Sequence, residues 1–317
     1  DAGADVFVAD ETPFFAAPST QGSLAELYAA HPDATVVAGA TDVGLWVTKQ
    51  LRNLPKVIHI GRARGLDEIV DYASQISIGA SATYGDAGPH LAAIDPDIGE
   101  VIRRIGAKQV RASGTIGGNI ANGSPIGDTS PMLIALGATL HLRHGAHERS
   151  LPLEDFFVAY GRQDRKAGEL VWRVDVPKLK ANEMFRCYKL SKRRDQDISA
   201  VMGAFKFTFD VRRIVSARVA FGGMAATPKR ARAVEAALTG NPWSEAVIRP
   251  AMQALESDYQ PIGDMRASAG YRMVVAKNPL PKADLEISGQ AATAALHPGA
   301  GGGGAGRRFA GRGGART

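Results

Sequence analysis

Cysteine is almost absent from this sequence of 317 residues, which contains only Cys187. One thiol cannot form an internal disulfide, and it cannot supply the ligands of an iron–sulfur cluster or a multi-cysteine metal site. We therefore expect a reducing, cytoplasmic environment and no metal bound by this chain. Cys187 lies in a strand-like run, Met184–Leu190, and is predicted to be a small buried hydrophobe rather than a nucleophile.

Long apolar runs and a strong charge on the body of the chain are also lacking. No apolar run is long enough to span a membrane, and the first residues show no signal-peptide pattern. The net charge is +6, but Arg307, Arg308, Arg312 and Arg316 follow Ser288 without any acidic residue. The 38 basic residues less these four leave 34 against 32 acidic ones, or +2. This balance gives no electrostatic reason to expect a nucleic acid as partner.

Two segments rich in glycine and small residues stand out: Val36–Leu45, with the sequence VVAGATDVGL, and Thr115–Asp128, with the sequence TIGGNIANGSPIGD. Main-chain N–H groups at a turn between a strand and a helix bind anions such as a pyrophosphate. Neither segment fits G-x-G-x-x-G or G-x-x-x-x-G-K-[ST], which excludes ordinary Rossmann and P-loop interpretations. On spacing alone, two unrelated structural turns are an equally good interpretation.

The periodic segments place the main boundary of the chain at a linker, Pro177–Glu183. Before it, short strands alternate with helices. After it, three strands precede three helices. The last is expected over Arg266–Ala276, and Pro279 and Pro281 are expected to break it. The residues from Gly289 onward are rich in Ala, Gly and Arg without a period, which predicts disorder.

A dense block of opposite charges, Lys192–Asp197, lies between the apolar segments Tyr188–Leu190 and Ile198–Met202. Such blocks usually form solvated turns. Because apolar residues hold this block at both ends, it is also able to screen or steer an anionic partner.

With these three segments placed, the chain resembles the flavin-binding part of the molybdenum hydroxylases over about Phe14–Lys277. It is most similar to the FAD-carrying small subunit of the bacterial xanthine dehydrogenase branch. The motifs are VVAGATDV from Val36, TIGGNIANGSPIGD from Thr115 and YKLSKRRDQDISAV from Tyr188, in that order and spacing. The triplet Gln109-Val110-Arg111, just before the second motif, also fits the pattern of this family.

The resemblance implies an α+β fold. A FAD-binding domain of the molybdenum hydroxylase and vanillyl-alcohol-oxidase-like type is expected over 10–178, in two subdomains that meet near 62–75. A small flavoprotein domain over 183–280 is expected to pack a three-stranded antiparallel sheet on helices. Residues 281–317 are expected to be a low-complexity tail.

The resemblance also implies a FAD site built from both loops and two strand ends. The second loop would hold the pyrophosphate, with Ser124 and Asp128 supporting it, and Lys189 would face the flavin. Relatives have Gly-Gly or Gly-Asn where this chain has Gly39-Ala40, and some have an aromatic residue near the flavin where Ile105 stands. The full set of implied FAD-binding residues is Val36, Ala38, Gly39, Ala40, Thr41, Asp42, Val43, Ile105, Thr115, Gly117, Gly118, Asn119, Ser124, Asp128, Val171 and Lys189.

The implied function is that of the FAD module of a xanthine dehydrogenase, with NAD as electron acceptor. A purine would be hydroxylated at a molybdenum cofactor on a partner subunit, and [2Fe–2S] clusters on a partner domain or subunit would pass the electrons to FAD. No side chain of this chain is expected to act as catalytic acid, base or nucleophile. The alternatives are the FAD subunit of a carbon monoxide or aromatic-substrate dehydrogenase, and a non-enzymatic protein that binds RNA or a partner through the Arg-Gly tail.

Overall fold

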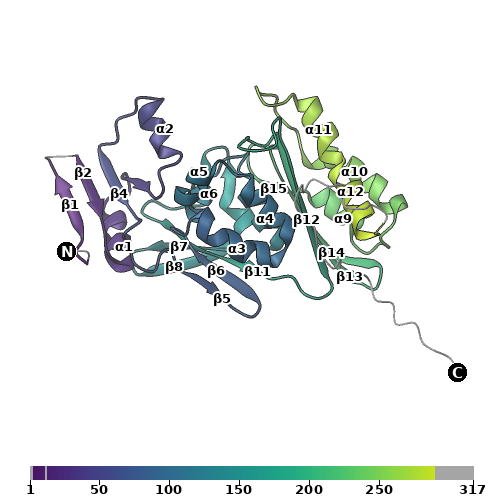
Figure 1. The fold of residues 1–317 in the computed structure, drawn as a ribbon, viewed down its shortest axis with the longest axis horizontal. Coiled ribbons are helices and arrows are strands. Elements are labelled where there is room, and N and C mark those ends of the chain that lie inside the picture. The colour runs from purple at the N-terminus through teal and green to yellow at the C-terminus, as the bar shows by residue number, and fades with distance from the viewer. Residues whose placement is uncertain (1–2, 11–12, 290–317) are drawn as a thin grey trace.

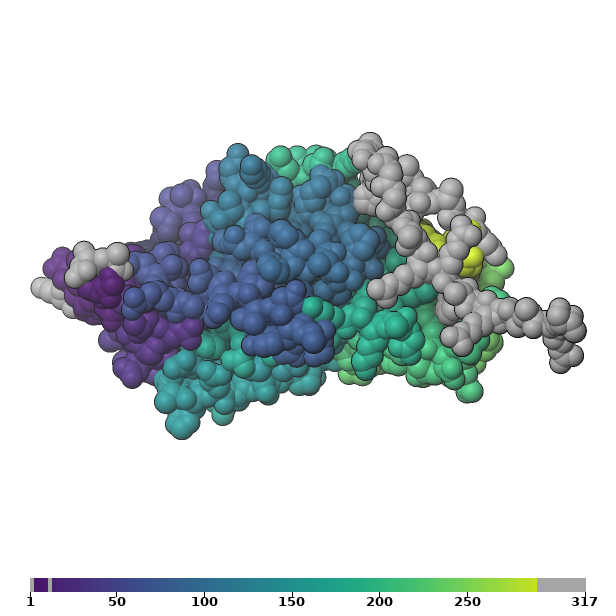
Figure 2. All heavy atoms as spheres, turned by 60° about the horizontal axis from the view of Figure 1, so that its bottom comes forward, coloured from purple at the N-terminus to yellow at the C-terminus, as the bar shows by residue number. Residues whose placement is uncertain are grey.

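Three larger sheets follow one another along the chain in the computed structural model, which describes residues 3–10 and 13–289 (Figure 1). Figure 2 shows an elongated molecule, with the first strands at one end and the last helices at the other. The order of the sheets in space therefore follows the order of the sequence.

The first sheet combines a hairpin with two parallel strands. Its order is β1-β2-β4-β3, in which β1 and β2 are antiparallel while β4 runs parallel to both β2 and β3. The helix after β2 buries Leu24, Ala25 and Tyr28 and contacts β7 of the second sheet, whereas the helix after β3 buries none of its residues. The elements are β1 (Val6–Ala9), β2 (Phe14–Ala17), α1 (Gln21–Ala30), β3 (Thr35–Val37), α2 (Val43–Thr48) and β4 (Lys56–His59).

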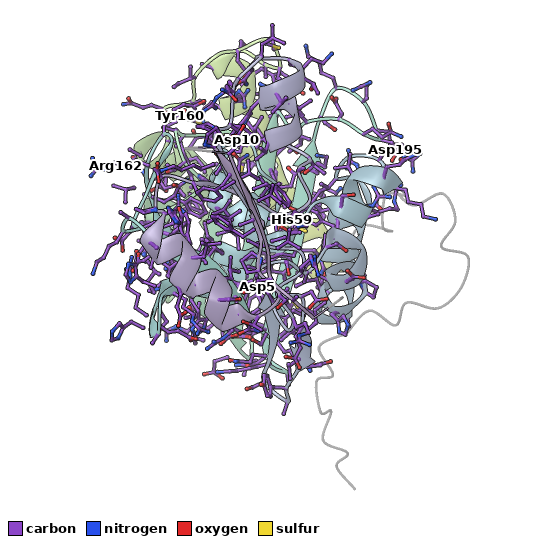
Figure 3. The ribbon with its side chains drawn as sticks, turned by 90° about the vertical axis from the view of Figure 1, so that its left-hand side faces the viewer. Asp5, Asp10, His59, Tyr160, Arg162 and Asp195 are labelled. Carbon is purple, nitrogen blue, oxygen red and sulfur yellow. The ribbon has the colours of Figure 1, made fainter. Side chains whose placement is uncertain are left out.

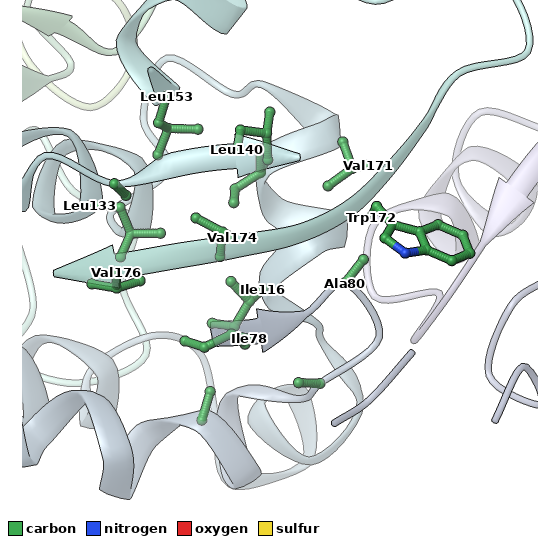
Figure 4. Close-up of a cluster of buried hydrophobic side chains, with 14 of the residues drawn as sticks. Ile78, Ala80, Ile116, Leu133, Leu140, Leu153, Val171, Trp172, Val174 and Val176 are labelled. Carbon is green, nitrogen blue, oxygen red and sulfur yellow. The ribbon is translucent and has the colours of Figure 1, made fainter. Parts of the chain in front are cut away.

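The second sheet is antiparallel, with order β5-β6-β11-β7-β8. Alternate residues of β11 point into the first hydrophobic core, where Val174 and Val176 meet Ile116 and Leu140 (Figure 4). This alternation is the period of a strand with one fully buried face. The strands are β5 (Ile69–Asp71), β6 (Gln75–Gly79), β7 (Thr139–His144), β8 (His147–Pro152) and β11 (Leu170–Pro177).

Five helices lie between β6 and β7, and all but α5 bury residues in this core; Figure 1 shows several of them lying over the sheet. They are α3 (Tyr84–Ile94), α4 (Pro96–Arg103), α5 (Lys108–Ser113), α6 (Ile116–Asn122) and α7 (Thr129–Leu136). After β8 come the short helix α8 (Leu153–Phe156) and a small hairpin of β9 (Phe157–Ala159) and β10 (Arg162–Gln163).

The third sheet is antiparallel and has helices on both faces. Phe205, Phe207 and Phe209 point to the C-terminal helices, while Met202 and Ala204 point to the first core. Helix α7 packs on β13 and β14 from that side, and all its residues are buried. The elements are β12 (Glu183–Leu190), β13 (Val201–Asp210), β14 (Arg213–Gly222), β15 (Lys229–Arg230), α9 (Arg232–Leu238), α10 (Glu245–Asp258), α11 (Ala269–Lys277) and α12 (Pro279–Ile287).

Cys187 lies on this interface, buried beside Met132, and burial raises the pKa of its thiol. The prediction of a buried small hydrophobe is confirmed. The mixed α and β architecture predicted from the sequence is also present.

Two details of the C-terminal part differ from the prediction. The sheet has a fourth strand, the two-residue β15, beside the three that were expected. Helix α11 ends at Lys277, just before the prolines that were expected to break it. A further helix was not expected, but Pro279 and Pro281 occupy the first turn of α12, where a main-chain N–H has no partner in the helix. The prediction of a low-complexity tail from residue 281 is therefore wrong for residues 281–287, which are helical. Residues 290–317, to which the Arg-Gly hypothesis refers, lie outside the described ranges.

Candidate functional site

A cavity of about 460 Å³ lies between the first and second sheets. It is bounded by the end of β3, the beginning of α6, the beginning of β11 and the β9–β10 hairpin. Twelve of the sixteen residues expected at the FAD site line this cavity: Val36, Ala38, Gly39, Ala40, Thr41, Asp42, Val43, Thr115, Gly117, Gly118, Asn119 and Val171.

The first loop offers main-chain donors. Within the described residues, the N–H groups of 39–43 have no hydrogen-bond acceptor. Ala40 has φ +56°, a left-handed conformation that Gly, and to a lesser extent Asn, adopts more readily than Ala. This explains in physical terms why the Gly-Ala pair is an unusual choice at this turn.

Gly39 allows the first loop to reach the segment before α6. A Cβ added there would lie 1.6 Å from the main-chain oxygen of Ser113. No side chain can be accommodated at such a distance, so glycine is needed for the approach of one main chain to another.

The second loop is different, because its N–H groups already have acceptors. Ile116 N–H donates to Ala82 O, and Gly117 N–H donates to Ala80 O. Thr115 caps α6 by accepting from the Gly118 N–H at 3.0 Å. The amides of 116–118 are thus occupied in this structure, and a role of this loop in holding the pyrophosphate stays a prediction.

What the second loop does provide is a surface without side chains and one unsatisfied amide group. A Cβ on Gly117 would lie 2.5 Å from Ala80, and Gly118 leaves its main chain exposed toward the cavity. The buried Oδ1 of Asn119 has no hydrogen-bond partner among the described residues. An unpaired buried polar atom beside a cavity indicates a ligand that completes its hydrogen bonds.

Together, these features fit a dinucleotide. Five consecutive amides provide donors for a diphosphate, glycines leave room for it, and apolar side chains such as Val36 and Val171 can contact flat rings. Among the described residues, no group of His, Cys, Asp and Glu is arranged to hold a metal ion.

Asp128 and Lys189 belong to a buried cluster beside the cavity rather than to its wall. Lys189 Nζ donates to Asp128 Oδ2 at 2.5 Å and to Ser199 Oγ at 2.9 Å, and Ser199 Oγ donates to Asp128 Oδ1 at 2.5 Å. The two charged side chains are 1% and 6% exposed. The cluster therefore links the start of α7 to the third sheet, and Lys189 is not among the residues that line the cavity.

Ile105 and Ser124 also lie outside the cavity lining. Ile105 is half-buried against the first core, and Arg111 donates to its carbonyl at 3.0 Å. Ser124 Oγ accepts from Ile126 N–H at 3.4 Å, which is consistent with support of the loop after α6.

The charged block 192–197 is held against α4. Arg104 donates to Lys189 O at 3.1 Å, to Ser191 Oγ at 3.1 Å and to Arg194 O at 2.8 Å. Arg103 adds an ion pair with Asp195 at 3.1 Å. The block is thus fixed from a third side as well as by its apolar flanks.

The sequence interpretation missed the cavity residues that come from α1 and the β9–β10 region. Tyr28, Gln163 and Arg165 line the cavity, and Gln163 Nε2 donates to Ala121 O at 3.1 Å. No local sequence pattern marks these residues, because they are far apart in the chain and come together only in the folded protein.

Comparison with known families follows the same division of the chain. The family described as FAD binding domain in molybdopterin dehydrogenase matches residues 11–179. The family described as CO dehydrogenase flavoprotein C-terminal domain matches residues 186–287.

Individual proteins of this kind are similar over most of the chain. Nicotinate hydroxylase of Emericella nidulans is 31% identical over 74% of this chain and 19% of its own length. Xanthine dehydrogenase of the same organism is 28% identical over 76% of this chain and 19% of its own length. The chain thus spans about a fifth of the length of these relatives.

A solved structure of carbon monoxide dehydrogenase from Hydrogenophaga pseudoflava has a similar fold. The TM-score is 0.79 with 26% sequence identity, and the match covers 84% of this chain and 94% of that one. The two-part architecture is therefore shared with a chain of similar extent.

Proposed function

Because the chain belongs to the family of FAD-binding domains of molybdopterin dehydrogenases, we propose that it carries the FAD of a xanthine-dehydrogenase-like enzyme, through which electrons from purine hydroxylation reach NAD. The molybdenum cofactor and the [2Fe–2S] clusters belong to partner domains or subunits in this proposal. A cytoplasmic location is part of it, supported by the single buried cysteine.

The observation that carries the proposal is the row of unpaired amides at 39–43, facing a cavity whose other wall is poor in side chains. FAD supplies the redox chemistry when bound, and the chain supplies position and hydrogen bonds. In this proposal the first loop binds the diphosphate, Gly118 permits close approach, and Asn119 Oδ1 accepts a hydrogen bond from the cofactor. Asp128 and Lys189 act by fixing the position of α7 against the third sheet.

The first test is the visible absorption of the purified chain. We expect the bands of oxidised flavin, and release of FAD rather than FMN on denaturation. A protein that stays colourless after incubation with FAD would contradict the proposal.

The second test concerns the acceptor. Anaerobic NADH should bleach the visible bands of the FAD-loaded chain, since hydride transfer between NAD and flavin is reversible. Bleaching by dithionite but not by NADH would leave FAD binding intact and remove NAD from the proposal. The purine is tested by isolating the whole complex through this chain and measuring xanthine oxidation with NAD.

The alternative is the FAD subunit of a hydroxylase with another substrate. It is favoured by the similarity to nicotinate hydroxylase and to the fold of carbon monoxide dehydrogenase. Under this alternative, the isolated complex oxidises carbon monoxide or an aromatic substrate such as nicotinate in place of xanthine.

A further inference from the structure

Arg165 is the only basic side chain among the described residues that line the cavity. The only acidic one is Asp42, in the first loop. Arg165 is exposed, so it lies where the cavity is open to solvent.

The Arg165 side chain is anchored on one side and free on the other. Its Nη1 donates to Tyr28 Oη at 3.0 Å and to Glu169 O at 3.2 Å. Within the described part of the chain, Nε and Nη2 have no acceptor. A guanidinium held in this way presents a flat face and unused donors in a fixed orientation.

The backbone around Arg165 is also held in place. Arg149 forms a bidentate ion pair with the buried carboxylate of Glu169, at 2.7 and 2.8 Å. The same carboxylate accepts from Lys166 N–H at 2.7 Å, and Arg149 donates to Asp164 O at 2.7 Å. Residues 164–169 therefore form a closed, internally bonded loop, and Arg165 is positioned before any ligand arrives.

Arg165 contacts the hydroxyl of Tyr28, whose side chain also lines the cavity, and the lining further includes the apolar side chains of Ala34, Val36 and Leu170. The amides without an acceptor among the described residues belong to another segment, which begins after β3 at Gly39. A guanidinium beside a tyrosine, in a cavity with apolar lining, suits a flat heteroaromatic base, which stacks on the cation and accepts its hydrogen bonds through ring nitrogens.

We propose that Arg165, positioned by Tyr28 and Glu169, binds the adenosine half of FAD and makes this cavity select the dinucleotide over FMN. The inference rests on FAD being the cofactor of the cavity. Arg165 contacts the base, whereas the first loop contacts the diphosphate.

The test compares Arg165→Leu with Arg162→Leu in titrations of the flavin-free protein. Arg162 lies on β10, three residues before Arg165; it is exposed like Arg165 but does not line the cavity, and Figure 3 shows it at the edge of the molecule. We expect Arg165→Leu to weaken FAD about tenfold and ADP to a similar extent, to leave FMN affinity unchanged, and to do so at both low and high salt. Arg162→Leu should bind all three as the unmodified protein does.

Other outcomes overturn the inference in recognisable ways. An equal loss for FAD and FMN would place Arg165 at the flavin half, and a loss that disappears at high salt would indicate a phosphate contact. Unchanged FAD affinity in Arg165→Leu, with FAD bound normally by the unmodified protein, would refute this inference alone. Failure of the unmodified protein to bind FAD would refute the proposed function. Arg165→Lys, which keeps the charge but not the planar group, should behave like Arg165→Leu and guards against misfolding of a single variant.

Discussion

The two glycine-containing loops at the cavity look alike in sequence but contribute different things. The amides of 39–43 have no acceptor in the part of the chain that the structure describes, while those of 116–118 are bonded to Ala82, Ala80 and Thr115. The first loop therefore provides hydrogen-bond donors, whereas the second provides a main chain that a ligand can approach closely and that internal hydrogen bonds hold in place. The comparison shows that a glycine-rich sequence does not by itself tell which of these two roles a loop has.

The largest effect on stability is expected from removing the positive charge of Lys189, which pairs with the buried Asp128 at the end of the second loop. Lys189→Met leaves Asp128 buried without its cation, which should cost about 3–5 kcal/mol of unfolding free energy. Urea denaturation of the variant and of Lys108→Met, whose side chain is exposed, measures the difference. A loss below about 1 kcal/mol would mean that water reaches the cluster.

A side chain on Gly39 should separate the two loops. Gly39→Ala places a Cβ against Ser113 O, so we expect the free energy of unfolding to fall by about 1–3 kcal/mol. The purified variant should also lose most of its bound flavin. Gly44→Ala is the matched control, because nothing lies within 4 Å of its added Cβ. Normal flavin content in Gly39→Ala would show that the two loops need not touch.

Substitutions at the two adjacent glycines of α6 are expected to have different effects, on flavin affinity at Gly118 and on stability at Gly117. Gly118→Val meets only the Thr115 hydroxyl, at 2.7 Å, so the fold should persist while flavin affinity falls by about tenfold or more. Gly117→Ala meets Ala80 and should lower the melting temperature first. Full flavin occupancy in Gly118→Val would remove this loop from the site.

Acid should loosen the cavity through the loop that holds Arg165. Hydrogen bonds from Arg149 lower the pKa of Glu169 from its ordinary value of 4.5. Its contribution is therefore complete above about pH 4.5 and is lost as the pH falls through the lower pKa of the folded state. In flavin-release curves against pH, Glu169→Gln should release flavin more readily at neutral pH and lose part of the acid dependence. The exposed Glu148→Gln should follow the unmodified curve.

The smallest effect is expected at the strained residue of the first loop. Ala40→Gly relieves a left-handed conformation worth about 1 kcal/mol, less the entropy gained by the unfolded chain. Flavin should still bind, and the melting temperature should stay level or rise slightly. A clear fall would show that the Ala40 methyl makes a stabilising contact.

The sequence predicted the fold and both loops because these depend on local periodicity and on recognisable motifs. It did not predict that the amides of α6 are occupied, since their acceptors, Ala80 and Ala82, belong to a separate segment. Arg165 was missed for the same reason. The ion pair of Lys189 was also not predicted, because strand position alone does not reveal a buried carboxylate opposite it.

Helix α7 has a consequence for any attempt to divide the protein. Its outer side is covered by β13 and β14, so a chain cut at the linker after β11 would expose Pro131, Met132 and their neighbours to water. Such a fragment would aggregate or recruit a substitute for the missing sheet. Expression boundaries and domain-swap designs should therefore keep the flavin-binding and C-terminal parts on one polypeptide.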